Sequence, residues 1–239
     1  MNRFSNIRYL ILICLVLSLG LSNSIYPQKH ALKIGTDIPL QYAVGYDYQI
    51  SPKFSAGTKL GILTTPYDEI ILGLFSLFGG NDTMIDIISN GYELGGILEL
   101  GGNYYFKNHY VSLHGQYISL QGSQARVDLV ETLIGRELEK LPPIINPQVK
   151  DDVIEVKSSL MQAAIRYGWI KQLKNPKLQL RTEVSLSLNL TSDTKLRSDE
   201  YDVSDAEVVM DKLLTEFYHH YAYLPSFNIY LVYFPGRKK

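Results

Sequence analysis

The sequence predicts an all-β fold, an eight-stranded antiparallel β-barrel that spans a membrane, with short turns at one end and three long, partly helical loops at the other. Segments in which apolar residues alternate with small or polar ones recur along the chain, and such alternation is a strand signal. The polar faces are rich in glycine, serine and opposed charges, as a crowded lumen requires. Short and long connections fall at opposite ends, which is typical of membrane barrels.

The alternation is plain in residues 40–63, which read LQYAVGYDYQI-SPK-FSAGTKLGIL. Every second residue of the first run is apolar or aromatic, and the second run repeats the pattern after a Ser-Pro-Lys break. This arrangement predicts a hairpin with one apolar face. The other face is too polar for the core of a soluble sandwich and too rich in glycine for an ordinary solvated face. It is therefore expected to line a lumen.

The same pattern predicts strands at 31–37, 40–50, 54–65, 91–106, 109–121, 153–173, 177–191 and 223–234. The connections 51–53, 107–108 and 174–177 are short and lie at the periplasmic end, where an even strand number also places both termini. The turn at 38–39 and the long excursions at 64–90, 122–152 and 192–221 lie at the other end. Helices are expected within 125–141 and from Ser204 to about His219, the latter opened by the capping box SDAE with Glu207. Several strands exceed the roughly 9–11 residues of a tilted span, so the barrel is expected to project beyond the outer leaflet.

Residues 1–24 have the features of a secretory signal peptide, which leaves 25–239 as a single barrel domain. Arg3 and Arg8 precede the apolar run 9–21, and Ser22-Asn23-Ser24 offers small residues for cleavage. Cleavage removes the only cysteine, Cys14, so disulfide, thiolate and cysteine-metal chemistry are excluded in the mature chain. It also removes two arginines and no acids, which moves the net charge from −1 to −3.

The composition argues against several classes of function. With 23 basic and 24 acidic residues and no concentrated basic face, nothing indicates nucleic-acid binding. Many of the 18 tyrosines lie near predicted strand ends, where the aromatic girdles of a membrane barrel are expected.

Taken together, these features resemble the small eight-stranded outer-membrane β-barrel proteins of bacteria. The resemblance rests on the signal at 1–24, the alternating strands, the loop asymmetry and a last strand, FNIYLVYF, that ends in Phe234. It implies an outer-membrane location, contact with outer-membrane lipid or lipopolysaccharide, and recognition of the terminal aromatic by the barrel-assembly machinery. If Phe227 and Tyr233 face the lipid, however, Phe234 turns inward.

Charged residues collect on the predicted lumen face and are expected to form a structural ion-pair network that fills the tube. These residues are Lys33, Asp37, Asp47, Lys59, Glu93, Glu99, His114, Arg166, Arg181 and Glu183. The alternative is a narrow path for protons or small ions. Glu93 and Glu99 lie about 20 Å apart along one strand, which is too far for an acid–base pair.

No catalytic residue, metal site or cofactor is predicted. Ser112 and His114 share the lumen face, away from acyl chains, and the chain has no GxSxG motif. His219 and His220 are neighbours in a predicted helix and point in different directions, so they do not form a ligand pair. A lipid-modifying enzyme with a serine, a histidine and an acid at the outer rim stays open as an alternative.

The first long loop carries an apolar run that includes Ile71, Leu74, Phe75 and Phe78. One interpretation is a helix packed on the barrel rim or the other loops. The other is an interfacial helix in the outer leaflet, or an exposed patch for a surface partner.

The predicted function is that of a non-enzymatic outer-membrane barrel acting through structured extracellular loops, in surface interaction, adhesion or envelope integrity. The alternatives are a lipid-modifying enzyme and a narrow channel. A different fold, a soluble periplasmic lipid-binding β-barrel with its apolar face inward, also fits alternation alone.

Overall fold

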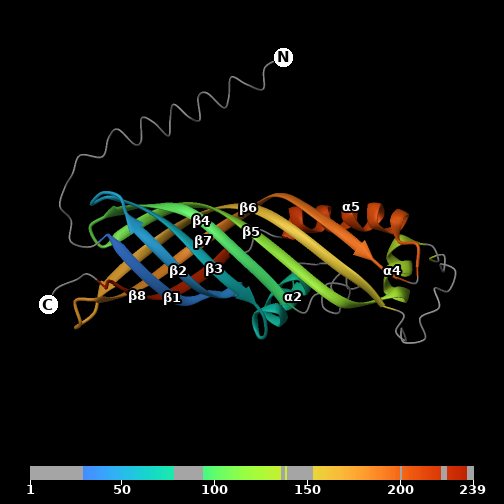
Figure 1. The fold of residues 1–239 in the computed structure, drawn as a ribbon, viewed down its shortest axis with the longest axis horizontal. Coiled ribbons are helices and arrows are strands. Elements are labelled where there is room, and N and C mark those ends of the chain that lie inside the picture. Colours follow the sequence, from blue (N-terminus) through green and yellow to red (C-terminus); the bar gives the residue numbers. More distant parts are fainter. Residues whose placement is uncertain are drawn as a thin grey trace, which may run out of the picture.

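A computed structural model describes residues 29–77, 94–135, 138, 153–199, 201–221 and 225–235. Its eight strands form a closed barrel in sequential order, each antiparallel to its neighbours, with β8 returning to pair with β1 (Figure 1). The strands are β1 (His30–Ile38), β2 (Gln41–Gln49), β3 (Phe54–Leu63), β4 (Leu94–Phe106), β5 (His109–Arg126), β6 (Val153–Gln172), β7 (Leu178–Arg197) and β8 (Pro225–Tyr233). The predicted fold class is confirmed.

The helices α2 (Tyr67–Leu77), α4 (Val127–Ile134) and α5 (Ser204–Tyr221) follow strand ends that point away from the short turns. α4 and α5 lie toward the far end of the molecule, and α2 lies nearer the middle of its long axis (Figure 1). Among the described residues, no helix combines the length and apolarity needed to cross a membrane. The turns at 50–53, 107–108 and 173–177 and both ends of the described chain lie at the other end, as the strand directions require.

In the half of the barrel nearer the short turns, here called the lower part, apolar side chains face outward and polar ones face inward. Leu113, Leu190 and Leu100 are 69%, 67% and 60% exposed, whereas Lys59, Asp37 and Arg166 are 1%, 1% and 4% exposed. A soluble lipid-binding barrel needs the opposite arrangement, because its ligand must lie among inward-facing apolar residues. That alternative fold is therefore wrong.

Two strands continue further than alternation alone predicts. β5 ends at Arg126 and β7 at Arg197, where the sequence pattern suggested 121 and 191. The pairing of β5 with β6 shifts between Gly122 and Ala125, and that of β6 with β7 shifts beside Met161. A bulge inserts an extra residue and breaks the period of two, so the pattern is lost although the ladder continues. The helix predicted from residue 125 consequently begins at Val127.

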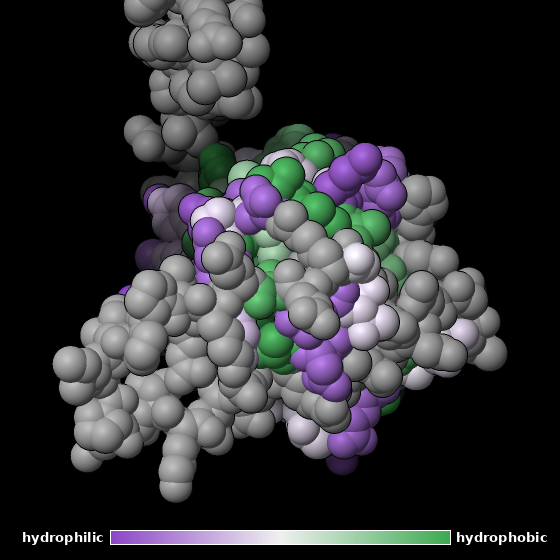
Figure 2. All heavy atoms as spheres, turned by 90° about the vertical axis from the view of Figure 1, so that its right-hand side faces the viewer, coloured by the Kyte–Doolittle hydropathy of each residue, from purple (hydrophilic) through white to green (hydrophobic). Residues whose placement is uncertain are grey.

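Above these bulges the chemistry of the two faces is reversed. The inward residues Ile154, Val156 and Leu196 are apolar and at most 6% exposed, while the outward residues include Lys157 and Lys195. The inward face packs under α5 and α4 in an apolar cluster that includes Val130, Met210 and Leu214. Figure 2, which faces this end of the barrel, shows hydrophobic residues between the hydrophilic ones. The long strands and α5 therefore form a protrusion with a core of its own.

Helix α5 also covers an open strand edge. β8 pairs with β7 only as far as Leu186, so among the described strands the later residues of β7 have no neighbour on that side. Glu207 and Asp211 of α5 accept hydrogen bonds from the backbone N–H groups of Leu196 and Thr194, at 3.0 and 2.7 Å. The Ser192 hydroxyl donates to Thr215 Oγ1 at 3.0 Å. Because Glu207 binds β7, the predicted capping box is wrong, and the Ser204 N–H donates instead to Asp202 Oδ1.

Candidate functional site: the charged lumen

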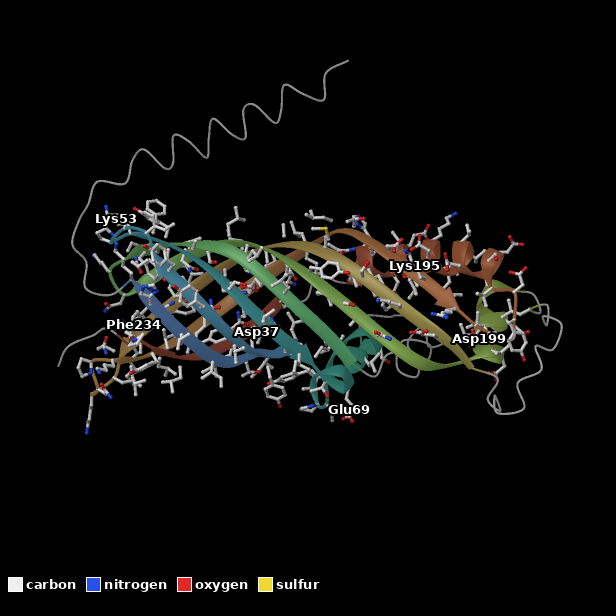
Figure 3. The ribbon with its side chains drawn as sticks, viewed as in Figure 1. Asp37, Lys53, Glu69, Lys195, Asp199 and Phe234 are labelled. Carbon is white, nitrogen blue, oxygen red and sulfur yellow. The ribbon has the colours of Figure 1, made fainter. Side chains whose placement is uncertain are left out.

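Nine of the ten predicted lumen residues are described, and the side chains of all nine are buried inside the barrel. Glu93 lies outside the described residues. Figure 3 shows Asp37 within the barrel, Lys53 and Phe234 toward the short-turn end, and Lys195 and Asp199 toward the loop end. The strand period places these groups inward, and the register between strands decides which of them meet.

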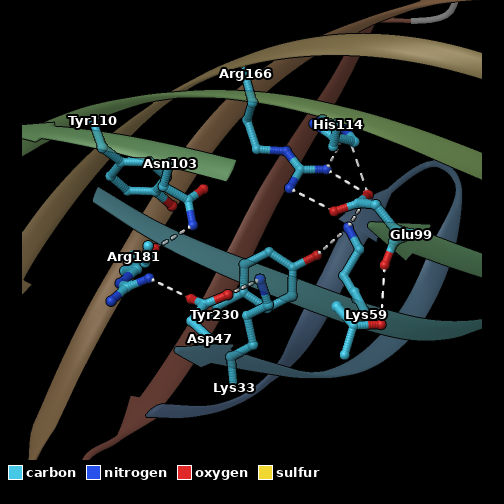
Figure 4. A network of polar contacts seen from close by, with 12 residues as sticks. Lys33, Asp47, Lys59, Glu99, Asn103, Tyr110, His114, Arg166, Arg181 and Tyr230 are labelled. Carbon is cyan, nitrogen blue, oxygen red and sulfur yellow. Dashed lines mark hydrogen bonds and ion pairs between the residues drawn. The ribbon is translucent and has the colours of Figure 1, made fainter. Parts of the chain in front are cut away.

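Asp47 holds two cations near the short-turn end (Figure 4). Its Oδ1 lies 2.9 Å from Lys33 Nζ and its Oδ2 lies 2.9 Å from an Arg181 guanidinium nitrogen. The Arg181 guanidinium carbon lies 5.6 Å from the ring centroids of both Tyr105 and Tyr110. Both cations therefore face a carboxylate, and the arginine also stacks against aromatic rings, which favours a buried guanidinium.

Glu99 is the centre of a second cluster. It accepts two hydrogen bonds from Arg166, at 3.0 and 2.8 Å, and its Oε2 lies 2.9 Å from Lys59 Nζ. His114 Nε2 lies 2.9 Å from the same arginine and 3.4 Å from the same carboxylate. The two-pronged arginine contact is the strongest form of this ion pair.

Asp37 and Glu183 complete the charge balance. Asp37 Oδ2 lies 2.5 Å from Lys59 Nζ, and Glu183 Oε2 lies 2.9 Å from Arg166 Nε. Each carboxylate also accepts from a buried tyrosine hydroxyl, Tyr230 for Asp37 and Tyr110 for Glu183. The described lumen thus contains four cations and four carboxylates, each within ion-pairing distance of an opposite charge.

Sequence reasoning missed the tyrosines of this network. Tyr110 and Tyr230 are each 1% exposed, although tyrosine was expected at the girdles. A signal was present, because Tyr110 shares its face with Ser112 and Tyr230 alternates with two apolar neighbours. Gly168 makes room for the Tyr110 ring, since a Cβ there would lie 2.4 Å from two ring carbons.

The network also includes the histidine of the lumen. His114 Nε2 contacts Arg166 and Glu99, which are groups of the network, and Ser112 is buried beside it on the same strand. Within the described part of the chain, no three His, Cys, Asp or Glu residues are grouped as metal ligands would be. Side chains fill the lumen of an eight-stranded barrel, and here they do so as neutralised pairs.

Comparison with known proteins adds little to this description. No family model matches the chain, and no curated protein sequence is significantly similar to it. Among solved structures, it is similar to CarO of Acinetobacter baumannii, at 10% identity over 89% of this chain and 100% of that one, with a TM-score of 0.41. CarO2 of the same organism gives the same identity and coverage with a TM-score of 0.38.

The chain is a small eight-stranded β-barrel protein. The closed strand order decides this, and at the level of fold it confirms the resemblance found in the sequence. The weak similarity to CarO assigns no function to it.

An aromatic belt runs across β3, β4 and β6 at the short-turn end of the barrel. Phe54 and Tyr104 have ring centroids 4.9 Å apart, and the series continues through Phe106 to Tyr167 and Trp169. Phe234 does not belong to this belt, because its side chain points into the lumen. It is 7% exposed and has the Arg181 guanidinium 5.9 Å from its ring centroid.

The apolar run of the first loop is only partly described. Ile71 lies in α2 and packs against the apolar cluster of the loop end. Leu74 and Phe75 lie in the same helix, but their side chains are outside the description, and Phe78 lies outside the described residues. At its start α2 is tied to the barrel by Tyr67, whose hydroxyl is hydrogen-bonded to that of Thr36 and whose ring lies 4.8 Å from Tyr42.

Proposed function

We propose that this protein is a non-enzymatic barrel of the bacterial outer membrane that presents a structured surface at its loop end. The observation that supports this most directly is the pair of inverted faces along β6 and β7. In the lower part apolar residues face outward and charges face inward; in the upper part this is reversed. Lipid around the lower part and water around the upper part account for both halves.

The height of the apolar surface fits a membrane. On β7 the outward residues run from Leu180 to Leu190 with Thr182 as the one polar member, a span of about 33 Å along the strand. With a strand tilt of about 40°, this corresponds to about 25 Å along the barrel axis, the usual apolar height of an outer-membrane barrel. The aromatic belt at the short-turn end marks one boundary, and the change to lysine marks the other.

The neutralised lumen favours a closed tube over a channel. Groups such as Arg166 and Lys59 are each held between two carboxylates, and moving them costs the contacts to both. We therefore assign the activity to the protrusion built from β5, β6, β7 and α5, as a surface for adhesion, partner binding or envelope integrity. Residues 1–24 act as a cleaved signal, and the barrel-assembly machinery inserts the chain.

Two measurements test this proposal together. We expect the protein in the outer-membrane fraction, migrating faster on SDS gels before boiling than after, because a closed barrel resists SDS at room temperature. We expect purified protein in planar bilayers to show no stable conductance steps, and Glu99→Ala to be the variant most prone to open a current. A soluble periplasmic band without a mobility shift contradicts the membrane assignment, and regular single-channel steps in the unmodified protein contradict the closed lumen.

A further inference from the structure

Two lysines lie directly opposite each other just above the apolar surface. Lys157 of β6 pairs across the ladder with Lys195 of β7, on the outward face. Both are exposed, with 69% of the Lys195 side chain accessible, and Arg197 is the next outward residue along β7. The last apolar outward residues before them are Met161 and Leu190, which are 53% and 67% exposed.

This pairing of two lysines is destabilising unless another group neutralises their charges. Like charges directly opposite each other in an antiparallel ladder are destabilising, and lysine is a poor strand residue. Among the described residues, Lys157 has no ion pair, and the nearest carboxylate to Lys195 is that of Asp193, at 3.9 Å with both side chains more than 60% exposed. So exposed a pair contributes little. The other carboxylate on this face, that of Glu155, lies opposite Arg197 in the ladder and not opposite either lysine.

The backbone beneath the lysines is fixed. Val156 and Leu196 form the adjacent ladder pair on the inner face, where they are 0% and 6% exposed in the cluster under α5. The N–H of Leu196 is held by Glu207. The two lysines are thus cross-strand neighbours on a hydrogen-bonded sheet and not on a loop, and a site on a regular element is better pre-organised than one on a loop.

Their height matches the lipid headgroups. Lys157 is four residues beyond Met161, about 13 Å along the strand or about 10 Å along the barrel axis at a tilt of about 40°. Lysine side chains extend several ångströms and bend toward the interface. This places both ammonium groups where the phosphates of the outer leaflet lie.

We propose that Lys157 and Lys195, with Arg197 beside them, bind the phosphate of an outer-leaflet lipid headgroup. A phosphate between the two ammonium groups turns their repulsion into two charge-assisted hydrogen bonds. The site rests on the proposed membrane placement, because only that placement brings headgroups to this height. It would anchor the protrusion to the surrounding lipid.

The test compares thermal unfolding in vesicles of neutral phosphatidylcholine with unfolding in the same vesicles containing phosphatidic acid. One variant is the double substitution Lys157→Gln/Lys195→Gln. The matched control is Lys212→Gln, which replaces an exposed lysine on α5. In neutral vesicles we expect the double variant to be at least as stable as the natural protein, because the like-charge pair is gone. With phosphatidic acid we expect a rise of several degrees in the natural protein and in Lys212→Gln, reduced by half or more in the double variant.

The outcomes separate the site from the membrane assignment. An equal rise in all three proteins overturns the site and leaves the barrel in the membrane. A rise of the same size when inorganic phosphate is added to neutral vesicles overturns the lipid as ligand. Failure of the natural protein to insert, seen as the absence of a heat-modifiable band, overturns the membrane assignment and the site with it.

Discussion

Glu99→Gln is the sharpest perturbation of the lumen network. The substitution keeps the shape of the side chain and removes one negative charge from a residue that is 4% exposed. Arg166 loses a two-pronged contact at 3.0 and 2.8 Å, and Lys59 loses a contact at 2.9 Å. The described lumen changes from four cations and four carboxylates to an excess of one positive charge.

The expected loss in the free energy of unfolding depends on which carboxylate partners each cation keeps. Removing one partner of a buried pair usually costs about 3–5 kcal/mol. Arg166 keeps Glu183 and Lys59 keeps Asp37, so we expect the lower half of that range, about 3 kcal/mol. Adding Arg166→Gln restores the charge balance, so the double variant should cost about 2 kcal/mol less than the sum of the two single changes.

Urea unfolding in lipid vesicles measures these differences. The only tryptophan, Trp169, faces outward in the aromatic belt and is 40% exposed, so its fluorescence reports the loss of lipid contact. Asp193→Asn is the matched control, because its partner Lys195 lies 3.9 Å away on the exposed outer face, and we expect a change below about 1 kcal/mol. Equal costs for Glu99→Gln and Asp193→Asn, or strictly additive costs in the double variant, would refute a network that stabilises the barrel through its paired charges.

Three further predictions concern separate parts of the barrel. Leu186→Arg, in the middle of the apolar surface, should lower the free energy of unfolding in lipid vesicles by about 2–4 kcal/mol. Leu186→Met should lower it far less, and the same urea titration measures both. Glu207→Gln should weaken the acceptor for the Leu196 N–H and raise hydrogen exchange of that amide at least tenfold, with the lumen amides unchanged. Gly168→Ala should cost about 1–3 kcal/mol through overpacking against a buried tyrosine ring, whereas Gly115→Ala, whose Cβ would meet its nearest atom at 3.9 Å, should be close to neutral.

The sequence predicted the strands and their facing well, because a barrel wall with lipid on one side and a narrow lumen on the other imposes a strict period of two. It could not predict where β7 ends. The bulge beside Leu190 breaks the period, and beyond it the inner face becomes apolar. The period of the pattern and the polarity of the inner face therefore change at the same place, and the sequence beyond it resembles a loop.

Within the site, the sequence indicated which charges face inward but not which of them meet. Lys59 and Glu99 are cross-strand partners only because of the register between β3 and β4, which the alternation within each strand does not determine. Tyr230 was missed for another reason, since tyrosine was expected in the aromatic girdles. Its alternation with Ile229 and Leu231 indicated the inward face, and its hydroxyl is hydrogen-bonded to Asp37 there.

The contact between α5 and the open edge of β7 also constrains how this protein can change in length. Residues 207, 211 and 215 of the helix meet residues 196, 194 and 192 of the strand. Four helical residues advance about 6 Å, and two strand residues advance about 6.6 Å, so the two elements stay in step over this distance. A taller protrusion would have to grow by about one helical turn for every two strand residues added. Insertions that ignore this ratio would leave N–H groups of the strand edge open to pairing with another chain.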